Sequence, residues 1–154
     1  LVKVAVVERH QGTGNVACGF LKGYGIKEGA VALSVAHDSH NIIVVGVNDE
    51  EMEFAVNSLI AQEGGIVLVK EGKVIEQMPM PIAGLMSDQS GEWVDEKLTS
   101  IHEKAYTELG ICGDVEPVMT LCFMSLAVIP EIKLTDMGLF DVTTFSFIPV
   151  EISR

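Results

Sequence analysis

The densest group of polar side chains in the chain is one short segment, His37-Asp38-Ser39-His40-Asn41. Apolar, β-branched runs at residues 30–36 and 42–47 flank it, so we expect the segment to join two strands at one end of a sheet. His10 follows another apolar run, at residues 2–7, after Glu8 and Arg9. If that run neighbours the other two in the sheet, three of the four histidines meet at the same end.

Histidines gathered in this way could hold a metal ion. His10, His37 and His40 would be the ligands, with Asp38 as a fourth or outer ligand, because imidazole and carboxylate groups suit zinc, iron or manganese. The alternative is that these histidines hydrogen-bond to loop backbone at the strand ends. A His-x-x-His spacing is weaker evidence for a metal than His-x-His on a strand or HExxH on a helix, so we favour the alternative.

Two other chemistries fit this region less well. A triad of Ser39, His40 and Asp38 would have to form from near-adjacent residues, whereas triad groups converge from different directions. The stretch Gly12-Thr13-Gly14-Asn15 suggests a phosphate loop, but the Walker pattern is absent and Ala17 stands where a dinucleotide fingerprint has its third glycine. Further glycines oppose the helix that should follow, so we interpret this stretch as a glycine-supported surface loop.

Helices and hairpins must position these residues. Asn48 and Glu51 form a capping box at the start of a first helix, which has its apolar stripe at Met52, Ala55, Val56, Leu59 and Ile60. Glu71-Gly72 lies between two apolar runs and predicts a hairpin. Ser87 or Ser90 caps a second helix that ends at Gly110. Its apolar stripe is Val94, Leu98, Ile101, Ala105 and Leu109.

The last part of the chain is harder to assign. The apolar run at residues 118–126 fits either a short buried helix or a strand. Runs at 132–134 and 145–150, with a turn at 136–138 after the first, suggest closing strands. We therefore predict a single domain over residues 1–154 of the α+β class, with mixed, mostly antiparallel sheets and about two main helices.

Composition limits the possible partners. The net charge of −12 disfavours nucleic-acid binding, because so acidic a surface repels phosphate backbones. The longest apolar stretch is about half of the roughly 20 residues that a membrane span needs, and no signal peptide opens the chain. Three cysteines without a CxxC spacing indicate reduced thiols and a cytoplasmic location. Because Leu1 leads directly into an apolar run, we expect the chain to come from a longer polypeptide.

Several ordered segments resemble the C-terminal region of adenine deaminases, the metal-dependent enzymes of the amidohydrolase superfamily. Together they extend over nearly the whole chain. They are residues 8–15, 19–25, 35–42, 46–49, 80–87, 119–121 and 129–136.

The resemblance implies an enzyme that hydrolyses adenine to hypoxanthine and ammonia at a manganese or iron centre in a (β/α) barrel. The His-x-His that opens such barrels is absent here, so the resemblance implies that the barrel lies upstream of Leu1 and that this chain alone is inactive. No metal ligand of the family can be assigned to a residue of this chain. The expected partners are the chain's own N-terminal barrel, adenine and further copies of the enzyme.

The residues expected to face the active site come from the polar segment and the first loop. They are His10, His37, Asp38, Ser39, His40 and Asn41. Three alternatives stay open: a non-catalytic module that binds a purine, an oligomerisation domain, and a stand-alone metallohydrolase.

Overall fold

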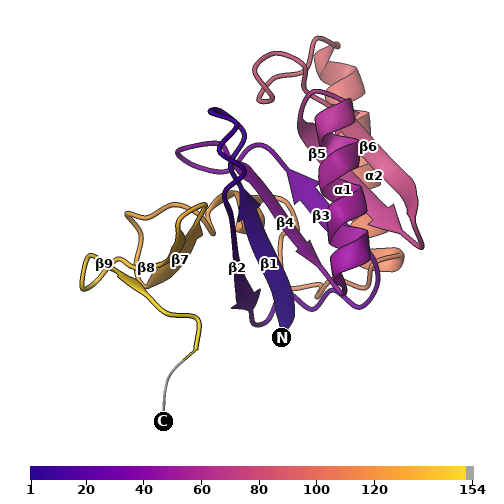
Figure 1. Ribbon diagram of the computed structural model, residues 1–154. Helices are drawn as coiled ribbons and strands as arrows, with labels where there is room; N and C mark the ends of the chain where they lie inside the picture. Colours follow the sequence, from indigo (N-terminus) through magenta and orange to yellow (C-terminus); the bar gives the residue numbers. More distant parts are fainter. Residues whose placement is uncertain (152–154) are drawn as a thin grey trace.

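The computed structural model describes residues 1–151, and within them two antiparallel sheets and three helices form an α+β fold (Figure 1). The predicted fold class is therefore confirmed. The larger sheet has the strand order β2-β1-β4-β3-β5-β6. Its strands are β1 (Val2–Val7), β2 (Val16–Leu21), β3 (Ala30–Leu33), β4 (Ile42–Gly46), β5 (Gly65–Lys70) and β6 (Lys73–Pro79). The smaller sheet contains β7 (Ile132–Thr135), β8 (Gly138–Asp141) and β9 (Ser146–Ile148).

The first helix, α1 (Asp49–Ala61), begins where the capping box predicts. The Asn48 side chain accepts a hydrogen bond from the Glu51 N–H at 2.8 Å, which satisfies one of the free amides of the first turn. Met52, Ala55 and Leu59 are buried against β3, β4 and β5, whereas Ile60 of the predicted stripe is 57% exposed. α1 therefore covers the middle of one face of the large sheet.

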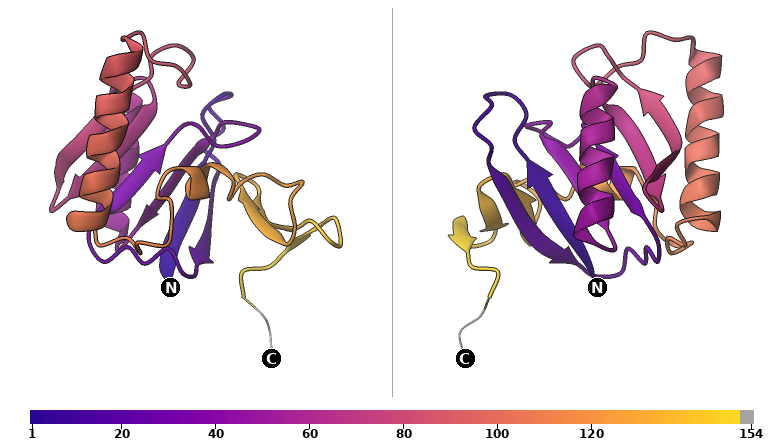
Figure 2. Two further views of the ribbon diagram at one scale, coloured as in Figure 1. Left: turned by 180° about the vertical axis from the view of Figure 1, so that it is seen from behind. Right: turned by 45° about the vertical axis from the view of Figure 1, so that its right-hand side comes forward.

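The second helix, α2 (Gly91–Thr107), covers the other face (Figure 2). Ser90 is its N-cap, which decides between the two serines that the sequence offers. α1 covers one face of β3 and β4, and a cluster that includes Ile101 of α2 and Leu121 of the following segment covers the other. Both strands are therefore buried on both faces, which explains their unbroken apolar runs. No helix in residues 1–151 is long and apolar enough to cross a membrane.

Two strands differ from the sequence prediction. No strand was predicted for residues 16–21, which follow the glycine-supported loop at residues 12–15, yet they form β2, which pairs along the whole of β1. Gly19 lets the small sheet approach closely there, because a Cβ at this position would lie 3.3 Å from the Leu139 side chain. β8 directly follows the predicted turn and was not predicted. The ambiguous run at 118–126 contains a short helix, α3 (Met119–Cys122).

Candidate functional site

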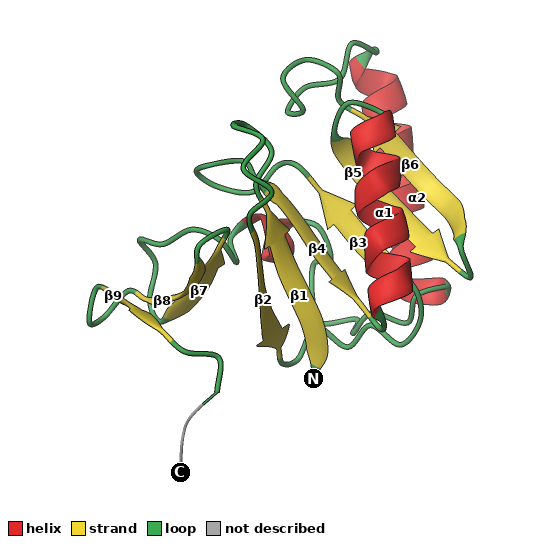
Figure 3. Cartoon of the chain, in the orientation of Figure 1, coloured by secondary structure: helices red, strands yellow, loops and turns green. Residues whose placement is uncertain are grey.

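Antiparallel pairing brings three distant loops to the same end of the large sheet, the upper end in Figure 3. β1 ends at Val7 opposite Ile42, the first residue of β4, so the loop after β1 lies beside the loop before β4. β6 ends at Pro79 opposite Gly65, where β5 begins. The loops 8–15, 34–41 and 80–90 therefore form one cluster, which we call the loop cluster.

The six residues predicted to face an active site all lie in the loop cluster. The His10 Nε2 atom hydrogen-bonds to the Ser39 carbonyl oxygen at 2.6 Å, and the rings of His37 and His40 contact edge to face with centroids 5.3 Å apart. Asn41 is buried, and its side-chain oxygen accepts a hydrogen bond from the Arg9 N–H at 3.3 Å. Asp38 and Ser39 are exposed at the tip of their loop. The three histidines thus meet as the sequence pattern suggested.

His40 differs from the other two histidines in its surroundings. Its Nδ1 atom is buried and has no hydrogen-bond partner within the described part of the chain. Burial lowers the pKa of the imidazole, and the nearby His37 and Arg9 lower it further. The neutral form of His40 is therefore favoured, and its buried Nδ1 atom has an unfilled capacity for one hydrogen bond.

The histidines of the loop cluster are not arranged as metal ligands in the described residues. Among residues 1–151, no three His, Cys, Asp or Glu side chains are arranged to hold a metal ion. His10 Nε2 instead faces a backbone carbonyl oxygen, a contact in which the nitrogen donates its proton and has no lone pair to offer a metal. The metal hypothesis for His10, His37, His40 and Asp38 is thus not supported, and the alternative of hydrogen bonds to loop backbone fits His10.

The glycine loop does not offer a phosphate cradle either. The Glu8 carboxylate accepts hydrogen bonds from the backbone N–H groups of Thr13, Gln11 and His10, at 3.1, 2.7 and 2.5 Å. These bonds, above all the one from Thr13, lower the pKa of Glu8 to about 2. The loop amides that would bind a phosphate therefore already hold an anion of the chain itself, and their role is to fix the loop.

Arg9 connects the three loops, and sequence reasoning missed it. Its Nε atom donates to the His40 carbonyl oxygen at 2.5 Å, and Nη2 donates to the Ala83 carbonyl oxygen at 2.8 Å. Burial lowers the pKa of the guanidinium, and within residues 1–151 it forms no ion pair. The sequence did contain one signal for Arg9, which is a cation that lies just after an apolar strand and beside His10.

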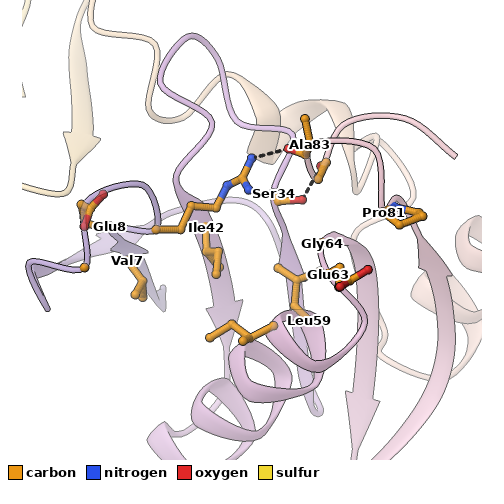
Figure 4. A pocket seen from close by; sticks show the side chains of 13 residues that line it. Val7, Glu8, Ser34, Ile42, Leu59, Glu63, Gly64, Pro81 and Ala83 are labelled. Atoms are coloured by element: carbon orange, nitrogen blue, oxygen red, sulfur yellow. Dashed lines mark hydrogen bonds between the residues drawn. The ribbon is translucent and has the colours of Figure 1, made fainter.

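A cavity of about 510 Å³ opens beside Arg9 (Figure 4). Its walls include Val7, Ile42 and Leu59, and Glu63 lies at its rim. Ser34 fixes one side, because its buried hydroxyl donates to the Gly84 carbonyl oxygen at 2.6 Å and accepts from the Gly65 N–H at 2.8 Å. The cavity therefore combines an apolar wall with groups of both charges, an arrangement that suits a small polar ligand or a protruding side chain.

Comparison with known families gives a match over residues 1–146 to the model of the adenine deaminase C-terminal domain. The chain belongs to this family. It is 76% identical over 98% of its length to adenine deaminase 2 of Desulfotalea psychrophila. It is 54% identical over 97% to an adenine deaminase of Nitratidesulfovibrio vulgaris, and 48% identical over 98% to that of Bacillus subtilis.

The chain spans 26% of the length of each of these three relatives, so it corresponds to one part of each of them. The structure also shows where the segments named in the sequence analysis lie. Three of them, at residues 8–15, 35–42 and 80–87, are far apart in the sequence and yet meet in the loop cluster, where Arg9 joins them. Segments that are far apart in the sequence are therefore joined at one end of the sheet.

Proposed function

We propose that this chain is the C-terminal domain of an adenine deaminase that hydrolyses adenine to hypoxanthine and ammonia, and that its loop cluster faces the active site. The observation that carries the proposal is the meeting of three distant loops around Arg9 and His40. A cluster that served only the fold would satisfy its own polar groups, whereas His40 Nδ1 is buried without a partner in residues 1–151.

The metal chemistry belongs to another part of the enzyme in this proposal. The described residues of this chain do not fit a metal ion, so a manganese or iron centre would be held by a barrel domain outside them. The proposal includes assembly into homo-oligomers. It also includes a cytoplasmic location, which suits the free thiols of Cys18, Cys112 and Cys122.

The residues of the loop cluster would position groups and exclude water. Arg9 holds the His37–Asn41 loop and the loop at residues 80–87 in fixed relative positions through two carbonyl oxygens. His40, kept neutral, can accept or donate one hydrogen bond at a defined place. Asp38 and Ser39, exposed at the tip of the loop, are the first groups that an adjoining barrel would meet.

The proposal is tested by His37→Ala and His40→Ala in the full-length enzyme. Each change removes a ring that contacts the other histidine but lies near the surface, so we expect kcat for adenine to fall by about ten- to a hundredfold through lost positioning. The melting temperature should change by less than about 3 °C. Steady-state kinetics and thermal unfolding measure the two effects.

His102→Ala is the matched control. His102 is a half-buried histidine on α2 whose partners are the Leu98 carbonyl oxygen and Glu116, and it lies outside the loop cluster. Its removal should leave kcat unchanged. Normal turnover of adenine by both the His37 and His40 variants would contradict the placement of the loop cluster at the active site.

A further inference from the structure

One face of the hairpin β1–β2 is mainly apolar, and its β2 side is exposed. Val16 and Phe20 of β2 are 56% and 61% exposed, and Cys18 between them is exposed as well. Their cross-strand partners on β1 are Val7, Lys3 and Ala5 respectively, so all six side chains project from the same face. We call these six residues the hairpin face.

The other face of the same strand is covered. Ala17 and Leu21 pack against the core, and Gly19 lies against Leu134 and Leu139 of the small sheet. On the side of the hairpin face, α1 packs against β3, β4 and β5, and its Met52 shares a buried cluster with Ala5 of β1. β2, farther from α1, stays open (Figure 1). The chain therefore supplies a cover for one face of β2 and none for the other.

The hairpin face continues into a groove of about 280 Å³ between α1 and the two strands, which is lined mainly by apolar side chains. Met52 and Val56 of α1 form one wall, and Val7 and Val16 form the other. Although the chain has 22 acidic residues, none of the six residues of the hairpin face is acidic. Its one charge, Lys3, pairs with Asp49 at 2.5 Å. A surface of this kind binds apolar protein surface.

We infer that the hairpin face is the surface on which the rest of the parent polypeptide docks. The chain spans 26% of its relatives' length, so most of such a polypeptide lies outside it. The face is also continuous with the loop cluster, because Val7 lines both the groove and the 510 Å³ cavity. A domain that covers the loop cluster can therefore extend over β1 and β2. The inference rests on the proposed membership in a longer enzyme.

The three cysteines of the chain provide the test. Cys18 lies on the hairpin face, Cys112 is exposed elsewhere, and Cys122 is buried, with burial raising the pKa of its thiol to about 11. Iodoacetamide alkylation, followed by mass spectrometry of the peptides, gives the rate at each thiol. It is measured in the full-length enzyme and in the 154-residue chain. Low reactivity of Cys122 verifies that each sample is folded.

We expect Cys18 to react at least about tenfold more slowly in the full-length enzyme than in the 154-residue chain, while Cys112 reacts at similar rates in both. Equal rates at Cys18 would overturn the inference. Protection of Cys18 that grows with the concentration of the 154-residue chain would also overturn it, since a second copy would then be the occupant. Deaminase activity of the unmodified full-length enzyme is measured separately, so failure of the proposed function is distinguishable.

A pair of valine variants locates the contact. Val16→Asp puts a charge on the hairpin face and should return the rate at Cys18 in the full-length enzyme to the rate in the 154-residue chain. Val128→Asp is the matched control, because Val128 is 68% exposed and lies outside the hairpin face. Cys18 should stay protected in the control. Continued protection of Cys18 in the Val16 variant would contradict docking on this face. If that variant unfolds, the comparison of Cys18 rates in the wild-type full-length enzyme and the wild-type 154-residue chain still tests the inference.

Discussion

Glu76 on β6 and Arg9 after β1 are both charged and partly withdrawn from water, but their surroundings differ. Glu76, whose side chain is 10% exposed, contacts Lys97 at 2.8 Å, Lys104 at 3.2 Å and the Ser100 hydroxyl, all on α2. Within residues 1–151, the Arg9 guanidinium bonds only to the neutral carbonyl oxygens of two loops. One group is thus neutralised within its own domain, and the other is not.

The difference lies in how the charge of each group is compensated within the described residues. Glu76 joins α2 to the sheet, and opposite charges within the domain compensate for its burial. Burial alone would raise the pKa of Glu76, but hydrogen bonds from Lys97 and Ser100 outweigh it and lower the pKa to about 2. Arg9 has no such compensation, so its arrangement is complete only if another group approaches the loop cluster. The comparison predicts that changes at the two sites affect different properties.

The largest effect on stability is expected from Glu76→Gln. The amide keeps the size of the side chain but leaves Lys97 and Lys104 without their counter-charge, so the free energy of unfolding should fall by about 2 kcal/mol. A carboxylate with a lowered pKa stabilises the fold above its unfolded value of 4.5 and loses this contribution as the pH falls toward about 2. The difference in the free energy of unfolding between wild type and variant should therefore be largest at pH 7 and should decrease below pH 4.5.

Urea unfolding at several pH values measures this gap, and deaminase activity of the full-length enzyme is the second readout. Glu76 lies between β6 and α2, outside the loop cluster, so kcat should not change at pH 7. A gap that stayed constant from pH 7 to pH 3 would show that the charge of Glu76 contributes nothing to stability. A loss of activity in a folded variant would remove the contrast between the two sites.

The second prediction is that Arg9→Lys affects activity more than stability. A single ammonium group cannot reproduce the planar fork that bonds to the His40 and Ala83 carbonyl oxygens together. We expect kcat of the full-length enzyme to fall about tenfold through loss of loop position. The free energy of unfolding should fall by less than about 1 kcal/mol, because both bonds lie near the surface. A variant that lost stability and kept its kcat would assign Arg9 to the fold.

The elements that were predicted correctly carry their signals locally. Asn48 and Glu51 lie three residues apart and cap α1 as predicted, and the Glu71-Gly72 turn joins β5 to β6. β2 was missed because its strand character depends on pairing with β1, and Gly19, which disfavours a strand locally, is accommodated by the distant Leu139. Tertiary contacts of this kind leave no short-range pattern.

The candidate site was predictable only in part, for the same reason. The meeting of His10, His37 and His40 followed from one condition, the pairing of β1 with β4, which the structure fulfils. The role of Arg9 did not follow, because its partners are backbone carbonyl oxygens 31 and 74 residues away. Every residue has such a carbonyl, so no pattern of side chains could have singled out those two.

The smallest effects are expected from a pair of glycine substitutions that isolate the position of Arg9. Gly84 and Gly72 have φ angles of 73° and 67°, so alanine costs about 1 kcal/mol of stability at either site. A Cβ at Gly84 would lie 2.9 Å from Nη1 of Arg9, whereas a Cβ at Gly72 would have nothing within 4 Å.

Gly84→Ala must therefore displace the guanidinium, and Gly72→Ala adds the same backbone strain without touching it. We expect kcat of the full-length enzyme to fall about threefold in the first variant and to stay unchanged in the second. The effect is smaller than that of Arg9→Lys because a flexible side chain can shift by a few tenths of an ångström and keep one of its two bonds. If Gly84→Ala and Gly72→Ala were equally destabilised and equally active, the exact position of Arg9 would not matter for turnover. The two hydrogen bonds of Arg9 would then stabilise the fold, as those of Glu76 do.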